Sequence, residues 1–144
     1  MNSAILPLVV VSSALLFAAD RATLPNQGIE PKPSRAEYDA TGFTESLAVG
    51  ATLVAPQRVR TLFGPQVDRQ YVVVEVGFYS KDRSSFPVRL GDFALKAPKG
   101  LERIAPEPPE RVASSTGGNP TAIVAKTLPQ VSTSRAVAGY LFFP

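Results

Sequence analysis

A run of ten residues, QYVVVEVGFY at positions 70–79, constrains the fold of this chain more than any other segment. Its side chains alternate at a period of two, which places Val72, Val74, Val76 and Phe78 in one apolar row. Valine, tyrosine and phenylalanine also pack well on the pleated, half-buried surface of a sheet. The run therefore predicts the central strand of a β-sheet, but it does not indicate a reaction.

Shorter apolar segments separated by turn residues predict the other elements. The expected strands are 43–54 (one or two segments), 86–90, 93–96, 101–104, 121–127 (weak) and 137–143. One short helix is expected after Pro56, where Val59, Leu62 and Phe63 have helical spacing and Gly64 follows as a stop. Residues 105–120 are expected to form at most a single helical turn, ending at Val112, before a mobile loop at 114–119.

Strands with proline and glycine turns between them, and no helices of 10 to 15 residues between strands, are typical of a sandwich or barrel. The chain has 144 residues, 44% of them apolar and 19% charged, which suits one globular domain. We therefore expect a mainly β chain. Residues 42–144 should form one domain, an antiparallel β-sandwich with one short helix.

The N-terminal part of the chain has a different composition. Residues 1–19, MNSAILPLVVVSSALLFAA, form an uncharged apolar segment of signal-peptide length. It is interpreted as a hydrophobic signal segment, with an uncleaved membrane anchor or a buried helix as the alternatives. Residues 20–41 lack apolar periodicity and contain three prolines, so they are interpreted as a linker or an extended arm. An export signal places the domain outside the cytoplasm, in the periplasm, in the medium or on the cell surface, with membrane contact only through residues 1–19 if they are retained.

The segments VAPQRVRTLFG, DRQYVVVEVGFYSKDRSSFPVRLGDFALKAPKG and AVAGYLFFP together resemble bacterial exported proteins of unknown function with an immunoglobulin-like β-sandwich. The resemblance covers about the last hundred residues and consists of packing features. It implies an immunoglobulin-like sandwich outside the cytoplasm of a bacterium, and it assigns no residue a role. In that family the chain continues past the GYLxFP strand, whereas this one stops at Pro144, so an incomplete sheet edge is expected.

The residue composition argues against most enzyme classes. The chain has no cysteine and no histidine, which removes disulfides, thiolate ligands, cysteine nucleophiles and the commonest general base and zinc ligand. The net charge is +3, but basic and acidic residues alternate, so no nucleic-acid-binding stripe is indicated. We expect no catalytic residue, no metal site and no cofactor.

A few polar residues are individual candidates for chemistry. Glu75 lies between valines, where it is either a buried acid of raised pKa or, as we favour, a residue on a solvated face or paired with Arg58 or Arg89. Asp82 opens a polar turn that is too poor in ligands for calcium. Residues 114–119 are glycine-rich but lack the lysine of a phosphate-binding loop.

Aromatic residues are the remaining candidates for a function. The candidate interaction surface consists of Tyr71, Tyr79, Tyr140, Phe142 and Phe143. Burial in a core is the more usual fate of such residues, and both interpretations stay open at this point. Tyr71 and Tyr79 are the best candidates for exposure, because both lie on the strand face opposite the Val72 row.

These patterns predict an exported, non-catalytic binding or structural module that acts through protein–protein contacts. Self-assembly is expected if residues 20–41 of one copy add to a free edge of strand 137–143 in the next, which would give rings or filaments. The alternatives are a plain tether with a covered edge, or a periplasmic carrier that holds a small apolar ligand in a pocket between two sheets.

Overall fold

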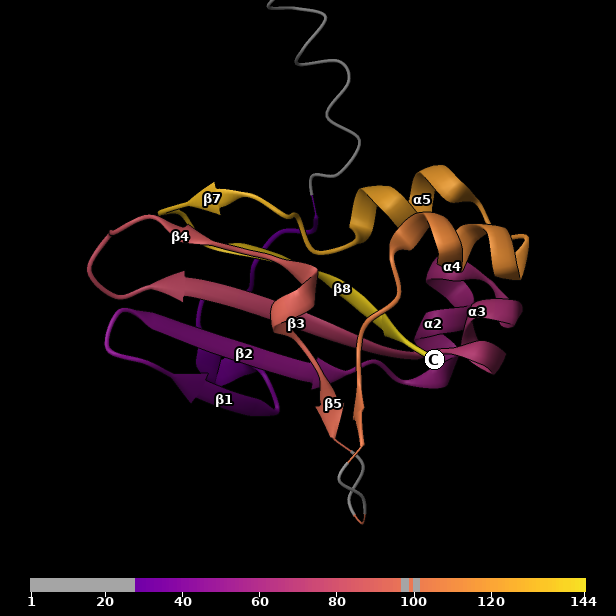
Figure 1. Cartoon of the computed structure of the whole chain (residues 1–144), viewed down its shortest axis with the longest axis horizontal. Helices are drawn as coiled ribbons and strands as arrows, with labels where there is room; N and C mark the ends of the chain where they lie inside the picture. The colour runs from indigo at the N-terminus through magenta and orange to yellow at the C-terminus, as the bar shows by residue number, and fades with distance from the viewer. Residues whose placement is uncertain (1–27, 97–98, 100–101) are drawn as a thin grey trace, which may run out of the picture.

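A four-stranded antiparallel sheet forms the centre of the protein in the computed structural model, which describes residues 28–96, 99 and 102–144 (Figure 1). Its order is β1-β2-β3-β8, and the strands are β1 Ala40–Phe43, β2 Leu47–Leu53, β3 Val72–Ser80 and β8 Val137–Phe143. The central strand predicted at 70–79 is confirmed as β3, which pairs with β2 on one side and β8 on the other. The strands predicted at 43–54 and 137–143 are also present.

Four helices lie together at one end of the sheet (Figure 1). They are α2 Pro56–Phe63, α3 Pro65–Gln70, α4 Pro109–Thr116 and α5 Pro120–Lys126. Each begins with proline, whose fixed φ and missing N–H suit the first helical position. The predicted short helix is confirmed as α2, and Gly64, at φ 96°, separates it from α3.

Two predictions for the C-terminal half are wrong. The weak strand expected at 121–127 is helix α5, and α4 continues to Thr116 through the first part of the expected loop. The reason is local capping combined with burial. The Asn119 side chain accepts hydrogen bonds from the backbone N–H groups of Thr121 (3.0 Å) and Ala122 (3.3 Å), and Ile123 is fully buried.

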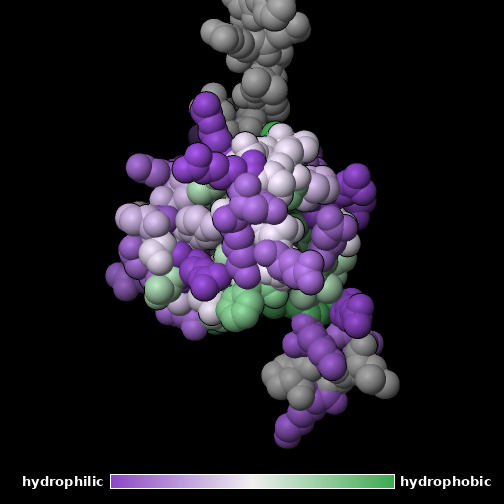
Figure 2. Space-filling model, turned by 90° about the vertical axis from the view of Figure 1, so that its left-hand side faces the viewer, coloured by the Kyte–Doolittle hydropathy of each residue, from purple (hydrophilic) through white to green (hydrophobic). Residues whose placement is uncertain are grey.

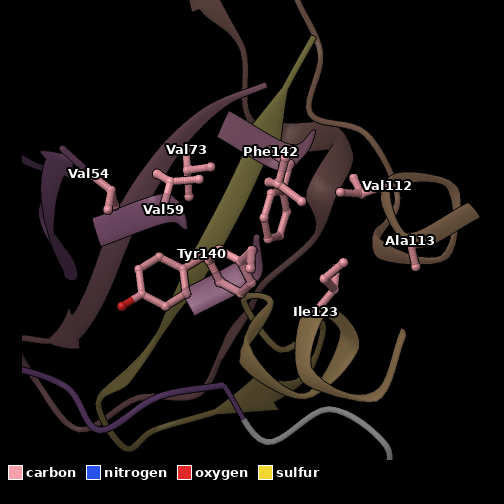
Figure 3. Close-up of a cluster of buried hydrophobic side chains, with 10 residues drawn as sticks. Val54, Val59, Val73, Val112, Ala113, Ile123, Tyr140 and Phe142 are labelled. Atoms are coloured by element: carbon pink, nitrogen blue, oxygen red, sulfur yellow. The ribbon is translucent and has the colours of Figure 1, made fainter. Parts of the chain in front are cut away.

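Both faces of the sheet are covered by apolar side chains. The first core packs the helices against β3 and β8 (Figure 3), and its buried members are Val54, Val59, Phe63, Val67, Val73, Val112, Ala113, Ile123, Tyr140 and Phe142. The second core lies on the other face and contains Val76, Phe78, Phe86, Val88, Leu128, Leu141 and Phe143. Two-sided burial explains why β3 and β8 are almost continuously apolar.

Two small sheets accompany the second face. β4 Phe86–Pro87 pairs with β7 Ser132–Thr133, and β5 Leu95–Lys96 pairs with β6 Arg103–Ile104 as a projecting hairpin; η2, Leu90–Asp92, lies between β4 and β5. Among the described residues 33% are strand and 31% helix, so the protein is a mixed fold with an antiparallel sheet. The expectation of a mainly β chain with one short helix is wrong on this point, because α3, α4 and α5 are also helical.

The segment before β1 packs on the sheet. Ile29 bridges to Ala138 of β8, and the short 3-10 helix η1, Arg35–Glu37, is capped by Ser34. Tyr38 is 5% exposed and lies over Gly50 and Gly77, which are paired across β2 and β3. Residues 28–41 of the expected arm therefore contact their own sheet, whereas residues 1–27, with the expected signal segment, lie outside the described residues.

Candidate functional site

The five predicted surface aromatics do not form one surface. Tyr140, Phe142 and Phe143 are 2%, 0% and 3% exposed, so the expectation that they contribute to an interaction surface is wrong. The cause is that β8 has apolar layers on both faces. Figure 3 shows the ring of Tyr140 beside the first core, with its hydroxyl pointing away from Val112 and Ile123.

Tyr71 and Tyr79 are half-buried, and each is committed to contacts within the chain. The Tyr71 hydroxyl lies 2.8 Å from Ser115 Oγ, and its ring meets the edge of Phe142. The Tyr79 hydroxyl donates to the carbonyl of Lys32 at 2.7 Å, and burial raises the pKa of that hydroxyl well above its ordinary value. Both residues therefore position neighbouring segments.

The outer edge of β8 is covered by the chain itself. Ile29, Leu128 and Glu107 donate backbone hydrogen bonds to Ala138, Tyr140 and Phe142 at 2.9, 3.0 and 2.7 Å, respectively. The expectation that β8 presents a free edge to a neighbouring molecule is therefore wrong, because three segments distant in sequence occupy its outward carbonyl groups.

The other edge of the sheet, at β1, is open within the described part of the chain. All four residues of β1 are exposed, and β2 is the only described strand that pairs with it. The Thr44 N–H donates to the carbonyl of Leu47 at 2.8 Å, so these two residues form a hydrogen-bonded pair. In an antiparallel ladder such pairs alternate with pairs whose backbone groups point outward. By this alternation the backbone groups of Thr41 and Phe43 point away from β2, toward the open side.

Phe43 marks this open edge. Its side chain is 66% exposed, and the cationic groups of Arg35 and Lys81 lie 5.0 and 4.9 Å from the centre of its ring. The Lys81 ammonium also donates to the carbonyl of Thr44 at 2.7 Å. An exposed apolar ring in contact with two cations, beside unpaired backbone groups, makes the β1 edge the best candidate in the described chain for contact with another strand.

A second candidate is a cavity of about 610 Å³ lined by Glu75 and by both charged and apolar side chains, which we call the Glu75 pocket. Its walls come from the segment before β1, β2, α2, β3, α5 and β8, and it is lined by Ile29, Glu30, Lys32, Thr52, Leu53, Val54, Ala55, Arg58, Leu62, Glu75, Lys126 and Tyr140. Glu75 is 8% exposed, so it is a buried residue of the sheet. The expectation of a solvated face is therefore wrong.

The charged groups of the Glu75 pocket interact over short distances. The ammonium of Lys32 lies 4.0 Å from Glu75 Oε1. The pKa of Arg58 is raised, first by its hydrogen bond with the Tyr140 hydroxyl and, to a smaller extent, by the charge of Glu75. Of the two arginines expected near Glu75, Arg58 lines this pocket, but the cation that the structure pairs with Glu75 is Lys32. Lys32 and Lys126 were missed because their segments carry no pattern that links them to β3.

The remaining carboxylates are dispersed. Asp82 accepts hydrogen bonds from the Ser84 hydroxyl (2.5 Å) and N–H (3.0 Å), which lower the pKa of its carboxyl group. Asp68 pairs with Arg60 at 2.6 Å, and Asp92 lies in the short turn η2. The described residues contain no group of three or more acidic side chains that would hold a metal ion.

A smaller apolar cavity of about 170 Å³ lies on the second face of the sheet. It is lined by Val49, Ala51, Val74, Val76, Phe93, Ala94, Leu95, Leu141 and Phe143. Figure 2 shows hydrophobic atoms gathered beside the base of the projecting hairpin on an otherwise largely hydrophilic side. The row predicted from Val74 and Val76 thus lines a space, while Phe78 of the same row packs against Phe86 and Phe93.

No protein-family model, curated protein or solved structure matches this chain. Within the described residues, no helix combines the length and apolar character that a membrane span requires. Any function assigned to the chain must therefore rest on its own geometry.

Proposed function

We propose that this chain is an exported, non-catalytic binding module that acts through protein–protein contacts and self-associates by strand addition at the β1 edge. The observation that carries the proposal is the full exposure of β1, whose outward backbone groups have no partner strand in the described chain. Unpaired edge groups of this kind are a template for another strand. Export rests on the composition of residues 1–19, and an immunoglobulin-like relationship is supported by the all-antiparallel order of the sheet.

The state of the two sheet edges decides the symmetry of the assembly. Association through two different edges would build rings or filaments, but β8 is occupied by its own chain. One open edge pairs with the same edge of a second copy, which gives a closed two-fold dimer. We therefore propose antiparallel pairing of β1 with β1, which joins two four-stranded sheets into one.

The absence of catalysis is supported by the placement of the carboxylates. Asp68 is paired with Arg60, Asp82 is bonded within its own turn, and Asp92 lies apart from both. Acid–base chemistry needs groups that converge on one reacting atom. No nucleic-acid partner is proposed, because the cations at the β1 edge, Arg35 and Lys81, contact the ring of Phe43.

Sedimentation velocity on the purified chain tests the dimer. Thr41→Pro removes an outward N–H from each copy without breaking the β1–β2 ladder. It should weaken dimerisation by about tenfold or more, because the two-fold interface loses two hydrogen bonds and gains steric clashes. Thr41→Ala retains the N–H and is the matched control, with unchanged association. The proposal fails if the wild type stays monomeric at its solubility limit, or if the proline variant dimerises like the wild type.

A second candidate function is a carrier of a small apolar ligand. It is favoured by the apolar cavity beside Val74 and Val76, whose volume of about 170 Å³ suits a ligand about as large as one aromatic ring. Native mass spectrometry of freshly purified protein separates the two proposals. A co-purifying apolar compound would support the carrier, and a bare protein mass would count against it.

A further inference from the structure

Glu75 places a buried carboxylate in the lining of an open cavity that has both polar and apolar walls. Glu75 is 8% exposed, and no described residue donates a hydrogen bond to its carboxylate. Its nearest cation, Lys32 Nζ, lies 4.0 Å away, beyond the usual range of a hydrogen bond, and donates instead to the carbonyl of Glu37 at 3.2 Å. A buried carboxylate without donors is costly, so a ligand that brings N–H groups to Glu75 would be stabilised there.

The pocket as a whole carries an excess of positive charge. Lys32, Arg58 and Lys126 face Glu75 and Glu30, which leaves one net positive charge. Arg58 is exposed, and it lines the pocket together with the buried Tyr140. A planar guanidinium at the rim is suited to bind a carboxylate through two parallel hydrogen bonds.

The two halves of the pocket select opposite charges. A ligand with only an ammonium group would pair with Glu75 but be repelled by Lys32, Arg58 and Lys126. A ligand with only a carboxylate would pair with Arg58 and leave Glu75 without donors. A ligand that carries both groups on one carbon atom pairs with both halves of the pocket.

The remaining walls define the rest of the ligand. Ile29, Leu53, Val54 and Leu62 supply apolar side chains, and Leu53 is 65% exposed at the rim. The cavity volume of about 610 Å³ lies in the range of small-molecule sites and is larger than the volume of one small ligand. A branched aliphatic side chain would cover this exposed apolar surface when it binds.

We propose that the Glu75 pocket binds an α-amino acid with an apolar side chain as its zwitterion. The ammonium group donates to Glu75, the carboxylate accepts from Arg58 with Lys126 nearby, and the side chain packs on the apolar wall. This site is separate from the β1 edge, so binding of the amino acid does not depend on dimerisation.

Isothermal titration calorimetry on the purified full chain tests the pairing of charges, with L-leucine as the probe. Isocaproate lacks only the ammonium group of leucine, and isoamylamine lacks only its carboxylate. Each should bind about tenfold or more weakly than L-leucine, because each loses one charge-assisted interaction. If isocaproate binds as tightly as L-leucine, or if L-leucine does not bind at millimolar concentration, the proposal is wrong.

Variants assign the two halves of the site. Glu75→Gln should weaken L-leucine by about tenfold or more and leave isocaproate as tight or tighter, whereas Arg58→Gln should weaken both of these ligands. Arg69→Gln is the control, because Arg69 is exposed on α3 and lies outside the pocket. Unchanged leucine affinity in Glu75→Gln would overturn the proposal. If circular dichroism shows that this variant does not fold, the titrations of the wild type with L-leucine, isocaproate and isoamylamine still test the proposal.

Discussion

At the scale of single residues, a pair of glycines determines how the N-terminal segment attaches to the sheet. Gly50 and Gly77 are opposite each other in β2 and β3, and the ring of Tyr38 lies against both. A Cβ atom at Gly77 would lie 2.3 Å from the Tyr38 hydroxyl oxygen, and one at Gly50 would lie 2.3 Å from Cδ2 of the same ring. Glycine is therefore required at both positions because the Tyr38 ring approaches the backbone closely, and not because of the backbone conformation.

Replacement of Gly77 by alanine should destabilise the fold. We expect Gly77→Ala to lower the free energy of unfolding by about 1–3 kcal/mol, the usual cost of overpacking, in urea denaturation. Gly42→Ala in β1 is the control, because no atom lies within 4 Å of its added Cβ, and it should be neutral or stabilising by up to about 1 kcal/mol. In a Tyr38→Ala background the penalty of Gly77→Ala should nearly vanish; a full penalty there would show that another contact is responsible.

At the scale of elements, the helix α5 depends on its first turn. It has seven residues, too few to be stable alone, and it replaces the strand that its β-branched residues suggested. Asn119 caps it and Pro120 occupies the first helical position. This Asn-Pro pair is the local signal from which the helix could have been predicted.

Removal of the cap should weaken α5 measurably. Asn119→Ala leaves the N–H groups of Thr121 and Ala122 without the side-chain acceptor, and we expect a loss of about 0.5–2 kcal/mol in the free energy of unfolding. Asn119→Asp keeps an acceptor oxygen and should stay close to the wild type. Equal losses in both variants would mean that the side chain acts through something other than the cap.

At the scale of the whole molecule, the two cores share the strands β3 and β8. Val73 faces the helical layer and Val76 faces the second core, with 1% and 4% of their surfaces exposed. Since one sheet supports both layers, we expect the described fold to unfold as a single cooperative unit.

Truncation of either valine should therefore lower the stability of the whole molecule. We expect Val73→Ala and Val76→Ala each to cost roughly 2 kcal/mol, with coincident denaturation curves from far-ultraviolet circular dichroism and tyrosine fluorescence. Val72→Ala, at a position 45% exposed, should change stability by less than about 0.5 kcal/mol. Separate transitions from the two probes would show that the layers unfold independently.

Elements with a local signal could be predicted from the amino-acid sequence alone. The period-two run at 70–79 predicted β3, the helical spacing after Pro56 predicted α2, and the apolar run at 137–143 predicted β8. In each case neighbouring residues carry both the pattern and the structure, because side-chain period follows directly from backbone geometry.

Which of these residues are buried, and which sheet edge is free, depends on contacts between segments that are distant in the sequence. Tyr140 and Phe142 look alike whether they lie on a surface or in a core, and their burial follows from helices and loops that are remote in sequence. Glu75 is brought close to Lys32 by a fold that spans 43 positions between them, and no local pattern encodes that distance. The β8 edge is closed by Ile29, Glu107 and Leu128, which leaves β1 as the open edge, because long-range hydrogen bonds depend on the path of the whole chain.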